Sequence, residues 1–122
     1  MNILVDTHIF IWILKAPEKI SAEHLHLLKS PHNFFLSSIS ITELLIKSSI
    51  GKLNVNYNPV EMALKSGLKL LDYSADDASQ LKNLPLHHKD PFDRMLIAQS
   101  LCQDYAIMTN DVKFKYYECI LI

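Results

Sequence analysis

Residues 3–12 read ILVDTHIFIW, which is a short apolar run, an acid and a threonine, and then a second apolar run. A run of three apolar residues without alternation is typical of a strand that is covered on both faces, as in a parallel sheet. The segment that follows, about 7–15, has helical length and spacing. A strand that leads directly into a helix, with Asp6 at the junction, predicts an α/β unit at the start of the chain.

The same alternation continues along the chain. Strand-length apolar runs occur at 3–5, 34–36, 70–71, 106–108 and 120–122. Helix-period segments lie between them, at about 7–15, 21–29, 38–50, 59–68, 75–83 and 91–104. Strands alternating with helices predict an α/β fold with a central parallel sheet of four or five strands flanked by helices in three layers. Because no repeat or flexible linker interrupts the pattern, we expect a single domain over residues 1–122.

Turn chemistry predicts several helix boundaries. Gly51 is placed to end the third helix in the left-handed conformation. Asp90 and Pro91 have the order of an N-cap followed by a proline at the first helical position, so the last long helix is expected to start there. The third helix is expected to begin near Ser37 or Ser38.

Composition excludes several classes of protein. Of the 122 residues 49% are hydrophobic and 20% are charged, the balance of an ordinary globular protein. The only two glycines, Gly51 and Gly67, cannot build a dinucleotide fingerprint or a phosphate loop. A formal charge of −1 gives no overall attraction for nucleic acid or an anionic membrane. Cys102 and Cys119 lack the close spacing of a metal knuckle or redox pair.

Nothing in the sequence predicts a membrane segment. The longest apolar run, residues 9–14, is far too short to span a bilayer. The first residues lack the charged leader and cleavage site of a secretory signal. We therefore expect a cytoplasmic protein with no membrane partner.

Four acids occupy corresponding places in this layout: Asp6 ends the first strand, Glu43 lies on the helix after the second, Asp93 is in the first turn of the last long helix, and Asp111 follows the fourth strand. In an open parallel sheet the functional crevice lies beyond the carboxyl ends of the strands, where these acids can meet. Crowded carboxylates are neutralised by a hard divalent cation, Mg²⁺ or Mn²⁺. Such a cation can activate water and stabilise charge on a phosphoryl oxygen.

Each acid also has a structural explanation when it is considered alone. Asp6 and Asp111 are each placed to cap a following helix, and Asp111 also fits a plain turn. Glu43 has the spacing of a capping box with Ser40. Asp93 is favoured by the helix dipole. The joint pattern is what favours a metal site.

Further residues surround these acids. Thr7, Asp90 and Thr109 are placed to orient the acids, although capping is the favoured role for Thr7 and Asp90. Basic and histidine side chains are candidates for contacts to a nucleic-acid backbone, with a solvated surface role as the alternative. They are His87, His88, Lys89, Arg94 and Lys113.

Four motifs together resemble the PIN-domain ribonucleases, specifically the VapC-type toxins of bacterial toxin–antitoxin pairs. They are LVDTHIFIW at 4–12, ISITELLIK at 39–47, LPLHHKDPFDRMLIAQS at 84–100 and IMTNDVKF at 107–114. The run HHKDPFDRMLIAQ is the most specific of them. The tail KYYECILI, residues 115–122, lies where members of the family vary, which leaves contacts to RNA open.

The resemblance implies a function. The acids that match Asp6, Glu43 and Asp93, helped by Asp111, would hold Mg²⁺ or Mn²⁺ and hydrolyse RNA to a 5′-phosphate and a 3′-hydroxyl. It also implies a cognate antitoxin and a homodimer. A catalytically inactive PIN-fold scaffold that binds RNA or protein is the alternative. A receiver-type phosphoacceptor fits poorly, because no second acid stands beside Asp6 and only Asp72 follows the third strand.

Overall fold

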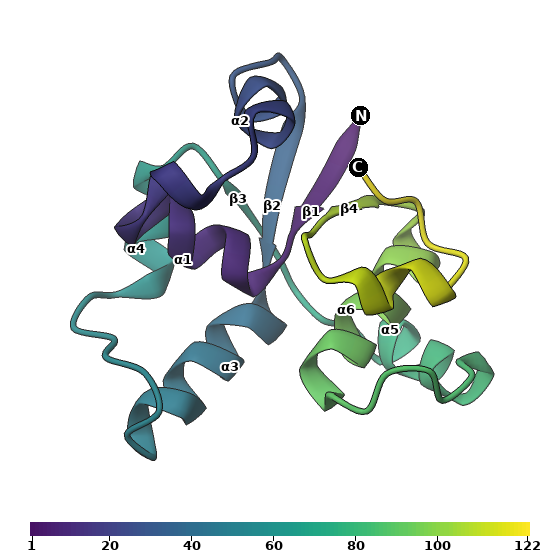
Figure 1. Cartoon of the computed structure of the whole chain (residues 1–122). Helices are drawn as coiled ribbons and strands as arrows, with labels where there is room; N and C mark the ends of the chain where they lie inside the picture. The colour runs from purple at the N-terminus through teal and green to yellow at the C-terminus, as the bar shows by residue number, and fades with distance from the viewer.

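A parallel sheet of four strands lies at the centre of the molecule, between helices on its two faces (Figure 1). The computed structural model describes residues 1–122. The strands are β1 (Asn2–Val5), β2 (Asn33–Ser37), β3 (Lys69–Leu71) and β4 (Ala106–Met108). The α-helices are α1 (Thr7–Lys15), α2 (Ala22–Leu28), α3 (Ser38–Ser49), α4 (Pro59–Lys65), α5 (Ala75–Ser79) and α6 (Pro91–Gln103), and the 3-10 helices are η1 (Pro17–Lys19), η2 (Gln80–Asn83) and η3 (Val112–Tyr116). No helix is long and apolar enough to cross a membrane.

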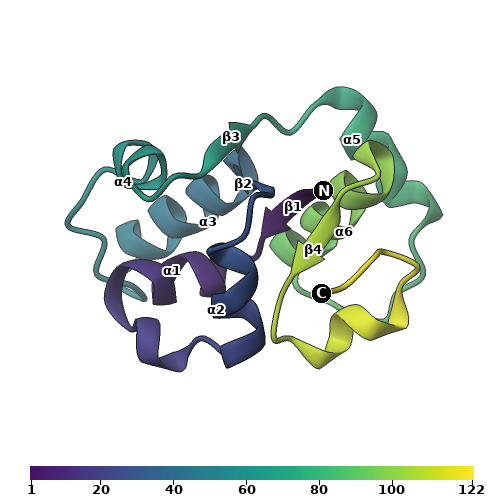
Figure 2. The same cartoon turned by 90° about the horizontal axis from the view of Figure 1, so that it is seen from above.

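The order of the strands in the sheet is β3-β2-β1-β4, and every neighbouring pair is parallel. From β1 the chain moves outward to β3 by way of α1 to α4, and it then returns past α5 and α6 to β4 on the other side of β1 (Figure 2). The direction of winding therefore reverses between β1 and β4. In open α/β sheets ligands bind outside the carboxyl ends of the strands at such a reversal.

Two hydrophobic cores sandwich the sheet, because successive side chains of a strand point to opposite faces. Ile3 and Val5 of β1 pack into one core with Phe10 of α1, while Leu4 packs into the other with Leu96 of α6. All five side chains are inaccessible to solvent. The helix α3 contacts both α1 and α6, so it bridges the two layers at the carboxyl end of β2. The expected α/β fold with three layers is confirmed.

The helix boundaries expected from the sequence are confirmed at the positions where a capping residue sets them. Gly51 has φ +76° just after α3, which is the left-handed conformation that glycine adopts most easily. The side chain of Asp90 accepts a hydrogen bond from the backbone N–H of Asp93, and Pro91 is the first residue of α6. Ser37 caps α3 by accepting from the backbone N–H of Ile39.

Three expected elements are shorter than the sequence pattern suggested. Residues 120–122 form no fifth strand, because only a single bridge joins Leu121 to Ile107 of β4. The helix expected over 59–68 ends at Lys65, before Gly67, whose φ of +83° cannot continue a helix. The helix expected over 75–83 is α5 followed by the 3-10 helix η2, which ends at Asn83 because Leu84, the residue before a proline, is extended.

Candidate active site

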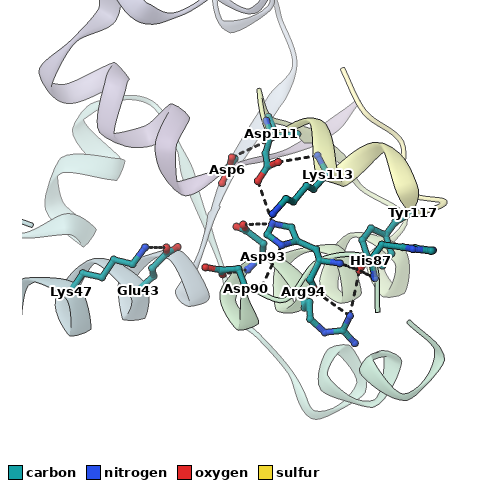
Figure 3. Close-up of polar contacts among 12 residues, drawn as sticks. Asp6, Glu43, Lys47, His87, Asp90, Asp93, Arg94, Asp111, Lys113 and Tyr117 are labelled. Atoms are coloured by element: carbon teal, nitrogen blue, oxygen red, sulfur yellow. Dashed lines mark hydrogen bonds and ion pairs between the residues drawn. The ribbon is translucent and has the colours of Figure 1, made fainter. Parts of the chain in front are cut away.

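The carboxyl ends of β1 and β4 bring two of the predicted acids together. Asp6 follows β1, and its backbone N–H donates to the carbonyl of Met108 in β4 at 3.0 Å. Asp111 follows β4 after a two-residue turn. Asp93 projects from the first turn of α6 toward the same place, and Glu43 reaches it from α3 on the other side (Figure 3).

The carboxylate of Asp6 is buried, and only one of its two oxygens accepts a hydrogen bond from a side chain. Its Oδ2 atom accepts a hydrogen bond from the Thr109 hydroxyl at 2.8 Å, and its Oδ1 atom has no partner. Asp6 stands at the N-cap position of α1, but its side chain makes no capping hydrogen bond. Burial raises the pKa of Asp6, while the Thr109 hydroxyl opposes this rise. Capping therefore does not explain why an acid is present at this position.

Asp93 lies in the most strongly perturbed environment of the chain. Burial, followed by the negative charges of Asp6, Asp90, Glu43 and Asp111, raises its pKa to about 8. All four of these acids are thus close enough to disfavour the charge on Asp93. The Asp93 carboxylate lies in the first turn of α6, where the helix dipole favours it, and it also contacts a histidine.

His88 is the partner that links two of the acids. Its Nε2 atom lies 2.8 Å from Oδ2 of Asp93 and 3.2 Å from Oδ2 of Asp111. Its Nδ1 atom accepts a hydrogen bond from the backbone N–H of Asp90 at 3.3 Å. A neutral imidazole that accepts at Nδ1 carries its proton on Nε2, so His88 donates toward both carboxylates. The side chain is buried between the acids, whereas the sequence predicted it only as a candidate contact to nucleic acid.

Glu43 has one paired and one unpaired carboxylate oxygen. Its Oε2 atom lies 2.6 Å from Nζ of Lys47, one turn further along α3, and its Oε1 atom is buried without a partner. This hydrogen bond with Glu43 raises the pKa of Lys47. No capping box forms with Ser40, because α3 already begins at Ser38 and places Glu43 in the second turn. Lys47 was not predicted as the partner of Glu43, although the spacing of four residues on one helix is the signal for such a pair.

The hydroxyl group of Thr109, the residue after β4, contacts both Asp6 and Asp111. Thr109 donates to Asp6, and its oxygen accepts from the backbone N–H of Asp111 at 3.0 Å. Asp111 also caps η3, since its Oδ1 atom accepts from the backbone N–H of Lys113 at 2.9 Å. The capping and cluster interpretations of Asp111 are therefore compatible: one oxygen caps the helix while the other faces His88.

A tyrosine from the end of the chain holds the loop that carries His88. The Tyr117 hydroxyl accepts from the backbone N–H groups of His87 at 3.1 Å and His88 at 2.8 Å, and it donates to the carbonyl of Pro85 at 3.0 Å. The guanidinium of Arg94 donates to the same Pro85 carbonyl at 3.0 Å. Sequence reasoning did not find Tyr117, and its only signal was the aromatic pair in the tail.

The remaining predicted residues have different surroundings. The Thr7 hydroxyl donates to that of Ser40 at 2.8 Å, which ties α1 to α3 and replaces the expected cap. Asp90 is the N-cap of α6, as the sequence indicated. Lys89, Lys113 and the ring of His87 are exposed, and neither lysine is in an ion pair.

The residues that are present fit a hard divalent cation. Oδ1 of Asp6 and Oε1 of Glu43 are buried oxygens with no hydrogen-bond donor. An unpaired buried carboxylate oxygen is costly, and a cation of the Mg²⁺ or Mn²⁺ type would satisfy it with the oxygen ligand it prefers. The positive charge of the cation would also make the ionisation of Asp93 less costly. Asp93 and Asp111 each have a carboxylate oxygen in one group of atoms within 4.8 Å of one another; the third atom is Nε2 of His88, which carries a proton and so donates to these oxygens instead of binding a cation.

Solved structures with the same fold are found in several bacteria. Three of them are VapBC2 from Rickettsia felis bound to a DNA fragment from their promoter, DNA-bound VapBC from Salmonella typhimurium, and VapBC-1 from nontypeable Haemophilus influenzae. The first matches with a TM-score of 0.76 and 20% identity over 100% of this chain and 98% of that chain. The second matches with a TM-score of 0.65 and 22% identity over 100% of this chain and 97% of that chain. The third matches with a TM-score of 0.68 and 20% identity, also over 100% of this chain and 97% of that chain.

Sequence comparison gives the family. No curated protein sequence matches the chain. The family profile described as PIN domain matches residues 3–118, which is nearly the whole chain and includes all the acids of the cluster. From this match and from the fold shared with the solved structures, we conclude that the chain belongs to the PIN domain family.

Proposed function

We propose that this protein is a metal-dependent endoribonuclease and the toxin of a toxin–antitoxin pair. The observation that carries the proposal is the cluster of acids at the carboxyl edge of the sheet, with unpaired buried oxygens on Asp6 and Glu43 and a pKa of about 8 for Asp93. A cluster that repels itself in this way is costly to the fold without a counterion, which supports a role in binding one.

Four side chains would hold the cation, Mg²⁺ or Mn²⁺: Asp6, Glu43, Asp93 and Asp111. When bound, the ion would supply Lewis-acid activation of water and stabilise charge on the phosphoryl group. The residues around the acids fix their orientation. Thr109 holds one oxygen of Asp6, and the N–H of His88 faces one oxygen each of Asp93 and Asp111.

Glu43 is the side chain we assign to the attacking water. Its Oε1 atom has no donor within the chain, so it is available to orient the water or take a proton from it. Lys47 holds the other oxygen and so fixes the direction of the carboxylate. The P–O bond to the water would form as the bond to the 3′ oxygen breaks and that oxygen gains a proton. The products are then a 5′-phosphate and a 3′-hydroxyl.

The partners follow the same proposal. Several of the solved structures with this fold are named as VapBC assemblies, and we extend to this chain a cognate antitoxin and a homodimer. Exposed large apolar side chains on α3 and α4 support a protein partner. They are Leu45, Ile46, Ile50, Val60 and Leu64.

Cleavage of RNA tests the proposal directly. The wild-type protein should cleave a pooled single-stranded RNA in Mg²⁺ or Mn²⁺ and should not cleave it in EDTA, while Ca²⁺ should support binding with little turnover because its coordination is longer and looser. Asp93→Asn should lose at least about a hundredfold in rate, since it removes a proposed ligand charge. Asp72→Asn, which alters an exposed acid outside the cluster, is the matched control and should cleave normally.

Two results would contradict the proposal. Full activity in EDTA would remove the metal mechanism. Intact RNA with wild-type protein in both metals would favour the alternative, an inactive scaffold. A single-stranded DNA of the same sequence, assayed in parallel, tests the assignment of RNA as the substrate.

A further inference from the structure

A pocket of about 340 Å³ lies beside the acid cluster, on the other side of the loop that carries His88. It is bounded by Asn83, Leu84, Pro85 and His87 on one side and by Tyr116, Tyr117 and Glu118 on the other, with Leu101 of α6 also in the wall. This volume is at the lower end of the range for small-molecule sites. Its walls combine apolar and aromatic side chains with the polar groups of Asn83, His87 and Glu118.

Aromatic rings form one wall of this pocket. The His87 ring has its centroid 5.7 Å from that of Tyr116 and 5.4 Å from that of Tyr117. Tyr117 is buried and hydrogen-bonded, but Tyr116 is 65% exposed and its hydroxyl makes no hydrogen bond in the chain. Neither core packing nor a hydrogen bond thus accounts for the position of Tyr116. It presents an aromatic face to solvent at the pocket.

The segments around the pocket carry unpaired positive charge. Lys82 precedes Asn83, Lys89 follows the loop, and Lys113 lies on η3 before Tyr116; all three are exposed, and none is in an ion pair, whereas Lys115 lines a different pocket. With Arg94 the first three are four of the twelve Lys and Arg residues in a chain whose net charge is −1. A local group of cations on a nearly neutral protein favours a polyanionic ligand at this place.

The pocket is structurally continuous with the acid cluster. The hydroxyl of Tyr117, whose side chain lines the pocket, accepts from the backbone N–H of His88, and His88 contacts Asp93 and Asp111. His87 and His88 are adjacent in the chain, yet His87 lines the pocket and the ring of His88 lies among the acids. A single strand that crosses the loop can therefore reach both places at once.

We propose that this pocket binds one unstacked base of single-stranded RNA. In this arrangement the base stacks on Tyr116 and His87, the polar groups of Asn83 and Glu118 face its edge, and the nearby lysines contact the flanking phosphates. Proteins bind single strands by this combination of stacking surfaces and cations. The inference rests on the proposed ribonuclease function and deepens it, because it names where the substrate is held next to the scissile bond.

The test uses the full chain carrying Asp93→Asn, so that the RNA remains intact. An RNA octamer containing one 2-aminopurine, whose fluorescence is quenched by stacking, is titrated with protein carrying Tyr116→Ala, Tyr116→Phe or Tyr57→Ala. Phe keeps the ring and removes only the hydroxyl. Tyr57 is a control on the segment between α3 and α4, outside the lining of this pocket, where the centroid of its ring lies 5.1 Å from the ammonium group of Lys15.

We expect Tyr116→Ala to weaken RNA binding by roughly tenfold or more, as loss of a base–aromatic stack does, and to lose the quenching. Tyr116→Phe and Tyr57→Ala should bind within about twofold of the parent, a spread well below the loss of one stack. With Asp93 intact, Tyr116→Ala should raise KM and leave kcat nearly unchanged.

Two outcomes separate this inference from the function on which it rests. Undiminished binding and quenching with Tyr116→Ala, while the wild-type protein still cleaves RNA in Mg²⁺, would overturn the base pocket and leave the ribonuclease proposal standing. If the wild-type protein neither binds nor cleaves RNA, the proposed function fails as well. Equal weakening by Tyr57→Ala would overturn the pocket, because the effect would not be local.

Discussion

Replacing Asp93 by Asn should stabilise the metal-free protein, and the gain should grow with pH. The pKa of Asp93 is about 8 in the folded protein, against 3.8 for the ordinary side chain. Between these values the folded protein keeps a proton that the unfolded chain releases, so the free energy of unfolding falls as pH rises through this window. The slope is at most about 1.4 kcal/mol per pH unit, because a single proton is involved.

The size of the stability difference follows from the interval between the two pKa values of Asp93. The Asn side chain is nearly isosteric with Asp and has no charge to bury, so the free energy of unfolding of the variant does not fall as pH rises through this interval. We expect Asp93→Asn to be more stable than the wild type by up to about 1.5 kcal/mol at pH 5 and up to about 5 kcal/mol at pH 8. Below about pH 4 the two proteins should differ little, because the wild-type carboxyl is then neutral in both states.

Urea denaturation in EDTA at pH 4, 5, 6, 7 and 8 measures this difference. Asp72→Asn serves as the control for removal of an exposed negative charge, and its difference from the wild type should change little with pH. If the stability difference between Asp93→Asn and the wild type is the same at every pH, the Asp93 carboxyl is not perturbed in the way the structure indicates. The electrostatic basis of the metal site would then be lost.

Three other perturbations have defined outcomes. Mg²⁺ at about a hundred times its dissociation constant should stabilise the wild type by about 2.7 kcal/mol in thermal unfolding but should leave Asp93→Asn nearly unchanged; equal shifts would argue against this acid as a ligand. Thr109→Val removes the donor to Asp6 and should weaken Mg²⁺ binding by about 10- to 100-fold by calorimetry, whereas Thr109→Ser should restore it. Tyr117→Phe leaves two loop N–H groups without their acceptor and should lower the free energy of unfolding by about 1 to 3 kcal/mol in urea; no loss would show that these hydrogen bonds contribute nothing.

The features of the fold that the sequence predicted are those specified locally. The strands β1, β2 and β4 are apolar runs, and the ends of α3 and α6 are set by Gly51 and by Asp90 with Pro91. The run at residues 120–122 has the same composition as a strand, yet it forms a single bridge because strand formation depends on what pairs beside it. Composition alone therefore does not distinguish an apolar run that forms a strand from one that forms only a single bridge.

In the candidate site too, the residues that could be predicted are those whose positions follow from local sequence, and the others depend on tertiary contacts. Asp6, Glu43, Asp93 and Asp111 were found because their places at the ends of strands and helices follow from the expected topology, and the structure brings them together. His88 was predicted only as a candidate contact to a nucleic-acid backbone, because its contact to Asp111, 23 residues away, depends on tertiary structure. Tyr117, 29 residues from His88, could not be assigned for the same reason. Their roles in RNA cleavage remain predictions.

The bridge between Leu121 and β4 also limits how two copies of the protein can associate. Ile107 donates its backbone N–H to Ile120 and accepts from Ile122, so the outer edge of β4 is already paired. At the opposite edge β3 is only three residues long and begins with the exposed Lys69. Short, charged or covered edges resist the addition of a strand from another molecule. Both edges therefore disfavour one continuous sheet across two copies, and we expect the proposed dimer to form through the side chains of the helices.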